Sequence, residues 1–139
     1  IVGIKDSSGD MTLTSEFVRL TKTGKKDFKV FGGKDTLIYG ALAHGADGAI
    51  ATTANMFPEL VVSIYEKYRA GDLKGSLEAQ FLLNPVRISM DRASFPVATK
   101  DMARLMGLDV GDPFLPNLPT SGDVLEHMKK KMREAGLLA

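Results

Sequence analysis

The chain opens with IVGIKDSSGD, residues 1–10, in which an apolar run gives way to a lysine and a polar loop. Its first four residues are apolar and suit a strand that is buried on both faces, as the strands of a parallel sheet are. Lys5 stands directly after them, and the polar residues 6–10 carry side-chain oxygens that can cap the N-terminus of a helix. The stretch therefore predicts a strand over residues 1–4, a lysine at its carboxyl end and a helix that begins soon after residue 10.

The same order of strand and helix recurs twice along the chain. Residues 28–31 predict a second strand, followed by the pair Gly32–Gly33 and a helix over residues 36–43. Residues 48–52 predict a third strand, followed by a helix that begins at Pro58. Strands that alternate with helices indicate an α/β fold with a parallel sheet. Three such units fit the end of an eight-stranded βα barrel or part of an open doubly wound sheet, and periodicity does not choose between them.

The strand pattern then gives way to helices. A long helix is predicted over residues 73–92 and a last amphipathic helix over residues 123–135. We therefore expect two regions, the βα units in residues 1–71 and a helical region in residues 72–139. The chain also begins inside an apolar strand without an initiator methionine, which favours a fragment of a longer protein.

Composition excludes several classes of function. The 139 residues include 18 Lys and Arg against 17 Asp and Glu, so the net charge of +1 does not indicate a nucleic-acid partner. There is no cysteine, which excludes disulfides, thiolate nucleophiles and iron–sulfur clusters and fits a cytoplasmic location. The two histidines are isolated, so no metal is expected. No apolar run approaches the length of a membrane span, so no membrane partner is expected.

Lys5 is the leading candidate for chemistry. In parallel α/β folds the functional groups gather at the carboxyl ends of the strands. Burial there favours a neutral amine, which attacks a ketone to give an imine, and the protonated imine is an electron sink for breaking or forming the adjacent carbon–carbon bond. The alternative is a lysine that reaches from the sheet to water. Lys34 and Lys100 compete less well, because Lys34 is expected to be exposed and Lys100 to be a solvated helix position.

The other two predicted strand ends also carry polar or flexible groups. Gly32 and Gly33 allow the backbone to approach a ligand closely and to offer N–H groups to a carboxylate, or they form a plain tight turn. Thr52, Thr53 and Asn55 can donate hydrogen bonds, although threonine also suits a strand for its β-propensity. Neither a P-loop nor a dinucleotide-binding glycine motif is present.

Residues 3–10, GIKDSSGD, resemble the dihydrodipicolinate synthase / N-acetylneuraminate lyase family, in which the sixth barrel strand ends in Gly, an apolar residue and Lys. FGGKD, residues 31–35, looks like the seventh strand and its glycine loop. GADGAI, residues 45–50, together with Asn55 looks like the eighth strand, and residues 95–108 resemble a segment of the C-terminal helices. The resemblance therefore covers nearly the whole chain.

The resemblance implies a (β/α)8 TIM barrel, of which this chain holds the last three βα units and the C-terminal helical region. It implies a carbon–carbon or carbon–oxygen lyase, without a cofactor, in which Lys5 forms a Schiff base with pyruvate or another 2-oxo acid. The backbone near Gly33 and Ile50 is implied to lie against the substrate, and the side chains of Asp35 and Thr52 to contact its hydroxyl groups. Family members are commonly homotetramers, so a homo-oligomer is expected.

Two departures leave the substrate open. The carboxylate-binding loop and the proton-shuttling tyrosine of the family lie on earlier strands, and Lys34 stands where many synthases have an acidic residue. The second substrate could therefore be that of a synthase, or that of a 2-keto-3-deoxy sugar acid, 4-hydroxy-2-oxoglutarate or N-acetylneuraminate aldolase. A hypothesis of another class is a module that binds a carboxylate or phosphate without covalent chemistry, through Gly32–Gly33 and the N-termini of helices.

Overall fold

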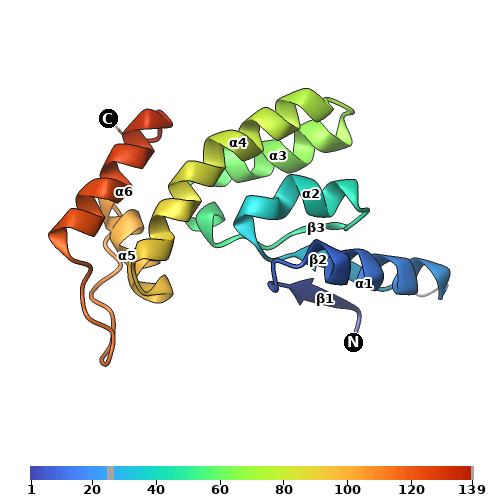
Figure 1. Cartoon of the computed structure of the whole chain (residues 1–139), viewed down its shortest axis with the longest axis horizontal. Helices are drawn as coiled ribbons and strands as arrows, with labels where there is room; N and C mark the ends of the chain where they lie inside the picture. The colour runs from blue at the N-terminus through green and yellow to red at the C-terminus, as the bar shows by residue number, and fades with distance from the viewer. Residues whose placement is uncertain (25–26, 139) are drawn as a thin grey trace.

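The structure is a computed structural model that describes residues 1–24 and 27–138 (Figure 1). Residues 25, 26 and 139, which fall within the two predicted regions, lie outside the described residues. In the described part of the chain, three parallel strands form one sheet in the order β1-β2-β3. The strands are β1 (Gly3–Asp6), β2 (Lys29–Gly32) and β3 (Gly48–Ala49). The parallel α/β arrangement expected from the sequence is confirmed.

The first strand begins two residues later than predicted. Because β1 covers Gly3–Asp6 rather than residues 1–4, Lys5 is part of the strand and pairs with Phe31 of β2. Lys29 N–H donates to the carbonyl of Val2 (2.9 Å), which begins the β1–β2 ladder. Lys5 is thus held by the sheet and not by a loop.

The third strand is shorter than predicted. The expected strand over residues 48–52 ends at Ala49, and Thr52–Asn55 form a 3-10 turn, η2. The last ladder bond is donated by the N–H of Ile50, and beyond it the backbone turns so that the carboxylate of Asp35 accepts hydrogen bonds from both the backbone N–H and the hydroxyl of Thr53 (2.7 Å each). A side chain from another segment has replaced the strand ladder as the partner of this backbone.

Helices follow each strand, as the sequence predicts. α1 (Met11–Thr23) begins after Asp10, whose carboxylate accepts hydrogen bonds from the N–H groups of Thr12 (2.8 Å) and Leu13 (3.3 Å). This is the N-cap expected from the polar loop. The next two helical segments are η1 (Asp35–Leu37) with α2 (Ile38–Ala43), and α3 (Pro58–Arg69), in which the proline stands in the first turn.

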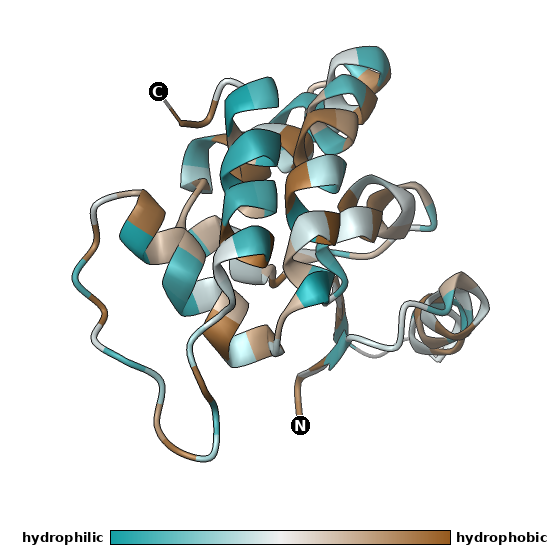
Figure 2. Ribbon diagram, turned by 60° about the vertical axis from the view of Figure 1, so that its left-hand side comes forward, coloured by the Kyte–Doolittle hydropathy of each residue, from teal (hydrophilic) through white to brown (hydrophobic). Residues whose placement is uncertain are grey.

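The second half of the chain is helical. α4 (Leu73–Ser89) continues into the 3-10 turn η3 (Met90–Arg92), so the predicted helix over residues 73–92 is confirmed with a tighter last turn. α5 (Phe95–Leu105) and α6 (Gly122–Glu134) follow. In Figure 1, α4 runs through the molecule from α3 to the group formed by α5 and α6. The connection between α5 and α6 loops out from the body of the molecule in Figure 2.

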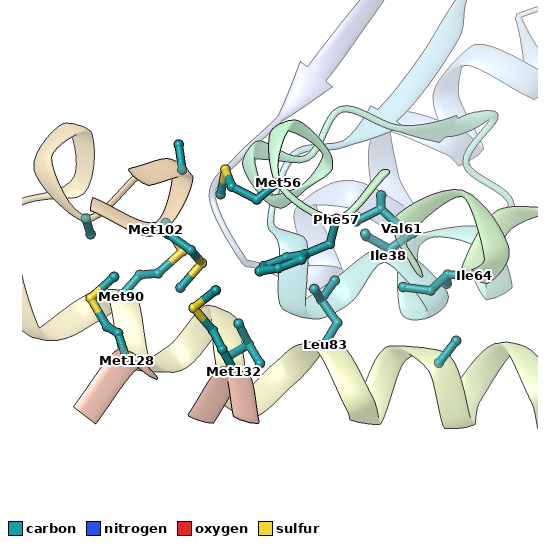
Figure 3. Close-up of a cluster of buried hydrophobic side chains, with 14 of the residues drawn as sticks. Ile38, Met56, Phe57, Val61, Ile64, Leu83, Met90, Met102, Met128 and Met132 are labelled. Carbon is teal, nitrogen blue, oxygen red and sulfur yellow. The ribbon is translucent and has the colours of Figure 1, made fainter. Parts of the chain in front are cut away.

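One apolar cluster joins the helices of both halves. Four fully buried methionines form one end of it in Figure 3: Met90, Met102, Met128 and Met132. Phe57 lies between them and Ile64 of α3, so residues from both sides of the predicted boundary at residue 72 share this core. The division of the chain into two regions stays a prediction. A search of the described residues finds no helix that could span a membrane.

Candidate functional site

The strand register decides which side chains share a face of the sheet. Lys5 lies opposite Phe31, and Phe31 lies opposite Gly48. In a parallel sheet, residues in one register row point to the same side, and successive residues of a strand point to opposite sides. Lys5, Phe31 and Gly48 therefore share one face.

The helices α1 and α2 cover the other face. Asp6, in the row next to Lys5, accepts a hydrogen bond from the hydroxyl of Thr14 in α1 (2.5 Å, Oγ1 to Oδ2). Gly32 faces α2 so closely that a Cβ at this position would lie 2.8 Å from the Cβ of Ala41. Lys5 thus projects from the face that these two helices leave uncovered.

Lys5 lies directly against the backbone of Gly33, the residue that follows β2. A Cβ on Gly33 would lie 2.7 Å from the Cε atom of Lys5, 2.9 Å from the carbonyl oxygen of Asp6, and in contact with the hydroxyl of Ser7. Real Cβ atoms essentially never approach other atoms so closely. The geometry explains a glycine at this position: the β2 tip can approach the lysine stem only without a side chain.

The N–H of Gly33 is already engaged. It donates to the carbonyl of Asp6 (2.7 Å) and continues the β1–β2 ladder past the end of the strands. The expectation of a free N–H that holds a carboxylate is therefore wrong at Gly33. The physical reason is that the parallel ladder extends one residue further than the strands themselves, and it takes up the donor.

The predicted burial of Lys5 is also wrong for the described residues, in which Lys5 is exposed. β1 has β2 as its neighbour on one side, and in the described residues no strand pairs with its other side. The helices α1 and α2 pack on the opposite face of the sheet, so neither of them covers Lys5. The lysine is nevertheless not remote from the tip of β2, because its side chain lies against Gly33.

Asp35 holds two turns together. Its side chain is 3% exposed, and Oδ2 accepts the two hydrogen bonds from Thr53, which is fully buried. Asp35 begins η1 after β2, and Thr53 lies in η2 after β3, so this contact ties one strand tip to the next. Its predicted contact with a substrate hydroxyl stays a prediction, and the structure gives this carboxylate a different role.

Gln80 of α4 belongs to the same network and was not singled out from the sequence. Its side chain is 3% exposed, its Nε2 donates to the carbonyl of Asp35 (3.0 Å) and to Oδ1 of Asn84 (2.7 Å), and its Oε1 accepts from the N–H of Tyr39 (2.9 Å). The signal in the sequence is its spacing from Leu83, which places a glutamine on the buried face of α4. A polar side chain at such a position needs hydrogen-bond partners.

The remaining predicted positions lie near the strand tips with less defined roles. Ile50 is 49% exposed, and its N–H donates to the carbonyl of Gly32 (2.9 Å), which extends the β2–β3 ladder. Thr52 is half-buried in η2, where its carbonyl accepts from the side-chain amide of Asn55 (2.9 Å). Their contacts with substrate stay predictions.

The competing lysines have different surroundings from those expected. Lys34 is half-buried and not exposed, and its stem passes within 3.9 Å of the position of a Cβ on Gly9. Lys100 is half-buried too, and its ammonium donates to the carbonyl of Val110 (2.5 Å). The prediction of a solvated Lys100 is wrong because the connection after α5 folds back over this side chain.

The carboxylate of Asp6 lies on the face of the sheet that α1 covers, opposite to the face of Lys5. Burial raises the pKa of Asp6, but hydrogen bonds from the hydroxyl of Thr14 and from Ser8 together lower it by more, so that the pKa lies below its ordinary value of 3.8. Asp6 is therefore ionised at neutral pH and fastens β1 to α1. In the described residues, no group of three or more His, Cys, Asp or Glu is placed to hold a metal ion.

Known proteins and a family model match nearly the whole length of the chain. The model of the dihydrodipicolinate synthetase family matches residues 1–135. A 4-hydroxy-tetrahydrodipicolinate synthase of Methanopyrus kandleri is 32% identical over 99% of this chain and 45% of its own length. An uncharacterised DapA-like lyase of Thermofilum pendens is 36% identical over 99% of this chain and 46% of its own length. The chain thus spans about half the length of the curated relatives it matches.

The solved structures decide between the two folds that the sequence leaves open. The crystal structure of dihydrodipicolinate synthase from Thermotoga maritima superposes with a TM-score of 0.94 at 31% identity, over 99% of this chain and 47% of that one. Such neighbours are (β/α)8 barrels, so the three parallel strands with their helices are part of a barrel. The doubly wound sheet is excluded.

Proposed function

Because this chain belongs to the dihydrodipicolinate synthetase family, we propose that it carries the imine-forming part of a lyase site, in which Lys5 forms a Schiff base with pyruvate or another 2-oxo acid. The observation that carries the proposal is the contact of the Lys5 stem with Gly33. This contact places a primary amine at the carboxyl ends of neighbouring barrel strands, where barrel enzymes collect their reacting groups.

The proposed reaction begins with the neutral amine of Lys5. Its nitrogen attacks the ketone carbon of pyruvate, and the hydroxyl group of the resulting carbinolamine takes up a proton and leaves as water, which gives a protonated imine. The positive nitrogen then accepts the electron pair of an adjacent C–H or C–C bond. Loss of a proton from the methyl carbon gives an enamine, which adds to an aldehyde, and the reverse sequence cleaves an aldol.

The open face around Lys5 bears on this chemistry. A neutral amine is favoured where the ammonium form is desolvated, and the described residues leave Lys5 exposed. The relatives are about twice as long, and a barrel closed over this face would supply the missing cover. We therefore propose that Lys5 reacts within a complete barrel and not on the open sheet.

The names of the relatives favour a synthase over the aldolases as the specific activity. Relatives at 31–32% identity are named 4-hydroxy-tetrahydrodipicolinate synthase, so we propose an aldol addition of pyruvate to an aldehyde as the working direction. A panel of aldehydes assayed with pyruvate tests this choice. Faster turnover with a sugar-type aldehyde than with an amino-acid semialdehyde would favour the aldolase alternative.

We also propose a homo-oligomer, in line with the family resemblance, and a cytoplasmic location. Large apolar side chains of α4 are exposed in the single chain and offer surface for association: Leu73, Phe81, Leu82 and Ile88. Light scattering would give the oligomeric state directly, and a monomer at micromolar concentration would contradict the first proposal.

The alternative without covalent chemistry is less well supported. It uses Gly32–Gly33 and the N-termini of helices, and the N–H of Gly33 is already bound to the carbonyl of Asp6. It also predicts ligand binding that survives the loss of Lys5.

Trapping with borohydride separates the two hypotheses. The protein at its full natural length is incubated with pyruvate and sodium borohydride, which reduces an imine to a stable amine, and the modified peptide is mapped by mass spectrometry. We expect the adduct on Lys5, its loss in Lys5→Ala, and its retention in Lys34→Ala. An adduct on another lysine, or none at all, would refute the assignment.

A further inference from the structure

We propose that Gln80 is a positioning residue, which from α4 holds the turns after β2 and β3 in the place where Lys5 can form its imine. The inference rests on the proposed function of Lys5 and extends it to a residue in the helical half of the chain. Gln80 itself is buried and does not touch the proposed reacting atoms.

The amide of Gln80 clamps η1 at both of its ends. Its Nε2 donates to the carbonyl of Asp35, the first residue of η1, and its Oε1 accepts from the N–H of Tyr39, two residues after the turn. The remaining hydrogen of Nε2 is bound to Asn84 one helical turn further along α4. All polar atoms of this amide therefore have partners, and its orientation is fixed.

The clamp reaches η2 through Asp35. The same residue that offers its carbonyl to Gln80 binds Thr53 with its carboxylate. Gln80 of α4 thus fixes the turn after β2 directly. It fixes the turn after β3 indirectly, because Asp35 binds Thr53.

The position of the Lys5 side chain depends on the position of η1, because Gly33 lies between them. Gly33 lies two residues before Asp35, and its backbone leaves no room for even a methyl group beside the Cε atom of Lys5. A shift of η1 would move Gly33, which would either clash with the Lys5 side chain or remove the contact that holds it in place. Displacement of a reacting group by about 1 Å can lower a rate by about 100-fold.

The base of the clamp is rigid because α4 is part of the apolar core. Ala79 and Leu83, on either side of Gln80, are 5% and 0% exposed and belong to the main cluster. Loss of the amide would remove the side-chain partner of the buried Asp35 carbonyl and of the half-buried Tyr39 N–H. Buried polar groups in this state are unfavourable, so η1 is expected to move toward other partners.

The test compares Gln80→Met with a matched control on the same helix, Ser76→Ala. Ser76 is fully buried, and its hydroxyl donates to the carbonyl of Ile64 in α3 (2.6 Å), away from the strand tips. Both variants lose buried hydrogen bonds of α4, and both are expected to unfold at a lower temperature. The rate of borohydride-trapped adduct formation at saturating pyruvate is measured per folded molecule, below both unfolding midpoints.

We expect Gln80→Met to lower that rate by about 10- to 100-fold and Ser76→Ala to leave it within about twofold of wild type. Equal rates in the two variants would overturn the inference, because Gln80 would then only contribute to packing. A wild-type protein without any adduct on Lys5 would instead refute the proposed function, and the inference would be refuted with it.

Gln80→Glu gives a second readout that a purely structural role does not predict. When it is protonated, the introduced carboxyl group donates to the Asp35 carbonyl and accepts from Tyr39, whereas its ionised form faces that carbonyl with a negative charge. The ratio of the variant's trapping rate to that of wild type should therefore rise as the pH falls. If the ratio of the two trapping rates does not change between mildly acidic and neutral pH, the positioning role is contradicted. This test remains valid if Gln80→Met does not fold.

Discussion

Replacing Gly33 with alanine tests the contact on which the proposed site depends. The new methyl carbon would lie 2.7 Å from the Cε atom of Lys5, about 0.7 Å closer than the 3.4 Å at which ordinary contact begins. The Asp6 carbonyl, 2.9 Å away, is fixed in the sheet ladder and cannot retreat as easily as a side chain. The Lys5 stem must therefore give way.

We expect two separable effects. Displacement of the amine by most of an ångström should slow adduct formation with pyruvate by about 10- to 100-fold. Forcing a methyl group into a closed contact should also lower the free energy of unfolding by about 1–3 kcal/mol. The first effect is measured by borohydride trapping and mass spectrometry at saturating pyruvate, and the second by urea unfolding followed by circular dichroism.

The matched control is Gly122→Ala at the start of α6, where an added Cβ would meet no atom within 4 Å. This variant should trap pyruvate at the wild-type rate. If Gly33→Ala is folded and also traps at the wild-type rate, then the position of Lys5 does not depend on this close approach, and the reasoning that places the site here is refuted.

Three further predictions concern stability. Thr53→Val removes a hydrogen bond to a buried carboxylate and should lower the free energy of unfolding by about 1.5–3 kcal/mol, measured by urea unfolding; an unchanged midpoint would contradict the network. Thr14→Val should destabilise the protein more at neutral pH than in acid below the ordinary carboxyl pKa. The lowered pKa of Asp6 means that its stabilising contribution is present above the ordinary value of 3.8 and is lost as the pH falls through the folded-state value, so an equal loss in both conditions would count against this bond. Met132→Ala opens a cavity at a fully buried position and should cost about 2–5 kcal/mol, whereas Met106→Ala, at 37% exposure, should cost much less; similar thermal shifts in both would show that the core is not packed as described.

The elements of the fold follow from local patterns in the sequence. The Asp10 cap, the first-turn Pro58 and the apolar spacing of α2 act over a few residues, and they place helices where the structure has them. The β3 strand is one exception, since the turn that follows it is held by Asp35, 18 positions before Thr53. A pattern of strand-forming residues contains no information about such a partner.

The candidate site divides in the same way. Lys5 and Gly33 stand out in the sequence because a lysine closes an apolar stretch and a glycine follows another. That they touch is a consequence of the parallel register, which pairs Asp6 with Gly32. Gln80 was missed because it acts on a residue 45 positions earlier in the chain, and its role is visible only when α4 has packed across η1.

Local patterns in the sequence were enough to predict an α/β chain in which three strand–helix units come before further helices, as the structure shows, whereas Lys5 as the reacting amine stays a prediction. The contacts between distant segments come from the tertiary structure alone: the Asp35 carboxylate binds Thr53, the Gln80 amide binds the Asp35 carbonyl, and the Lys5 stem lies against Gly33. The reason is one of range. Helix caps and apolar periodicity arise between neighbours in the chain, whereas burial and side-chain hydrogen bonds depend on which distant segments the packing brings together.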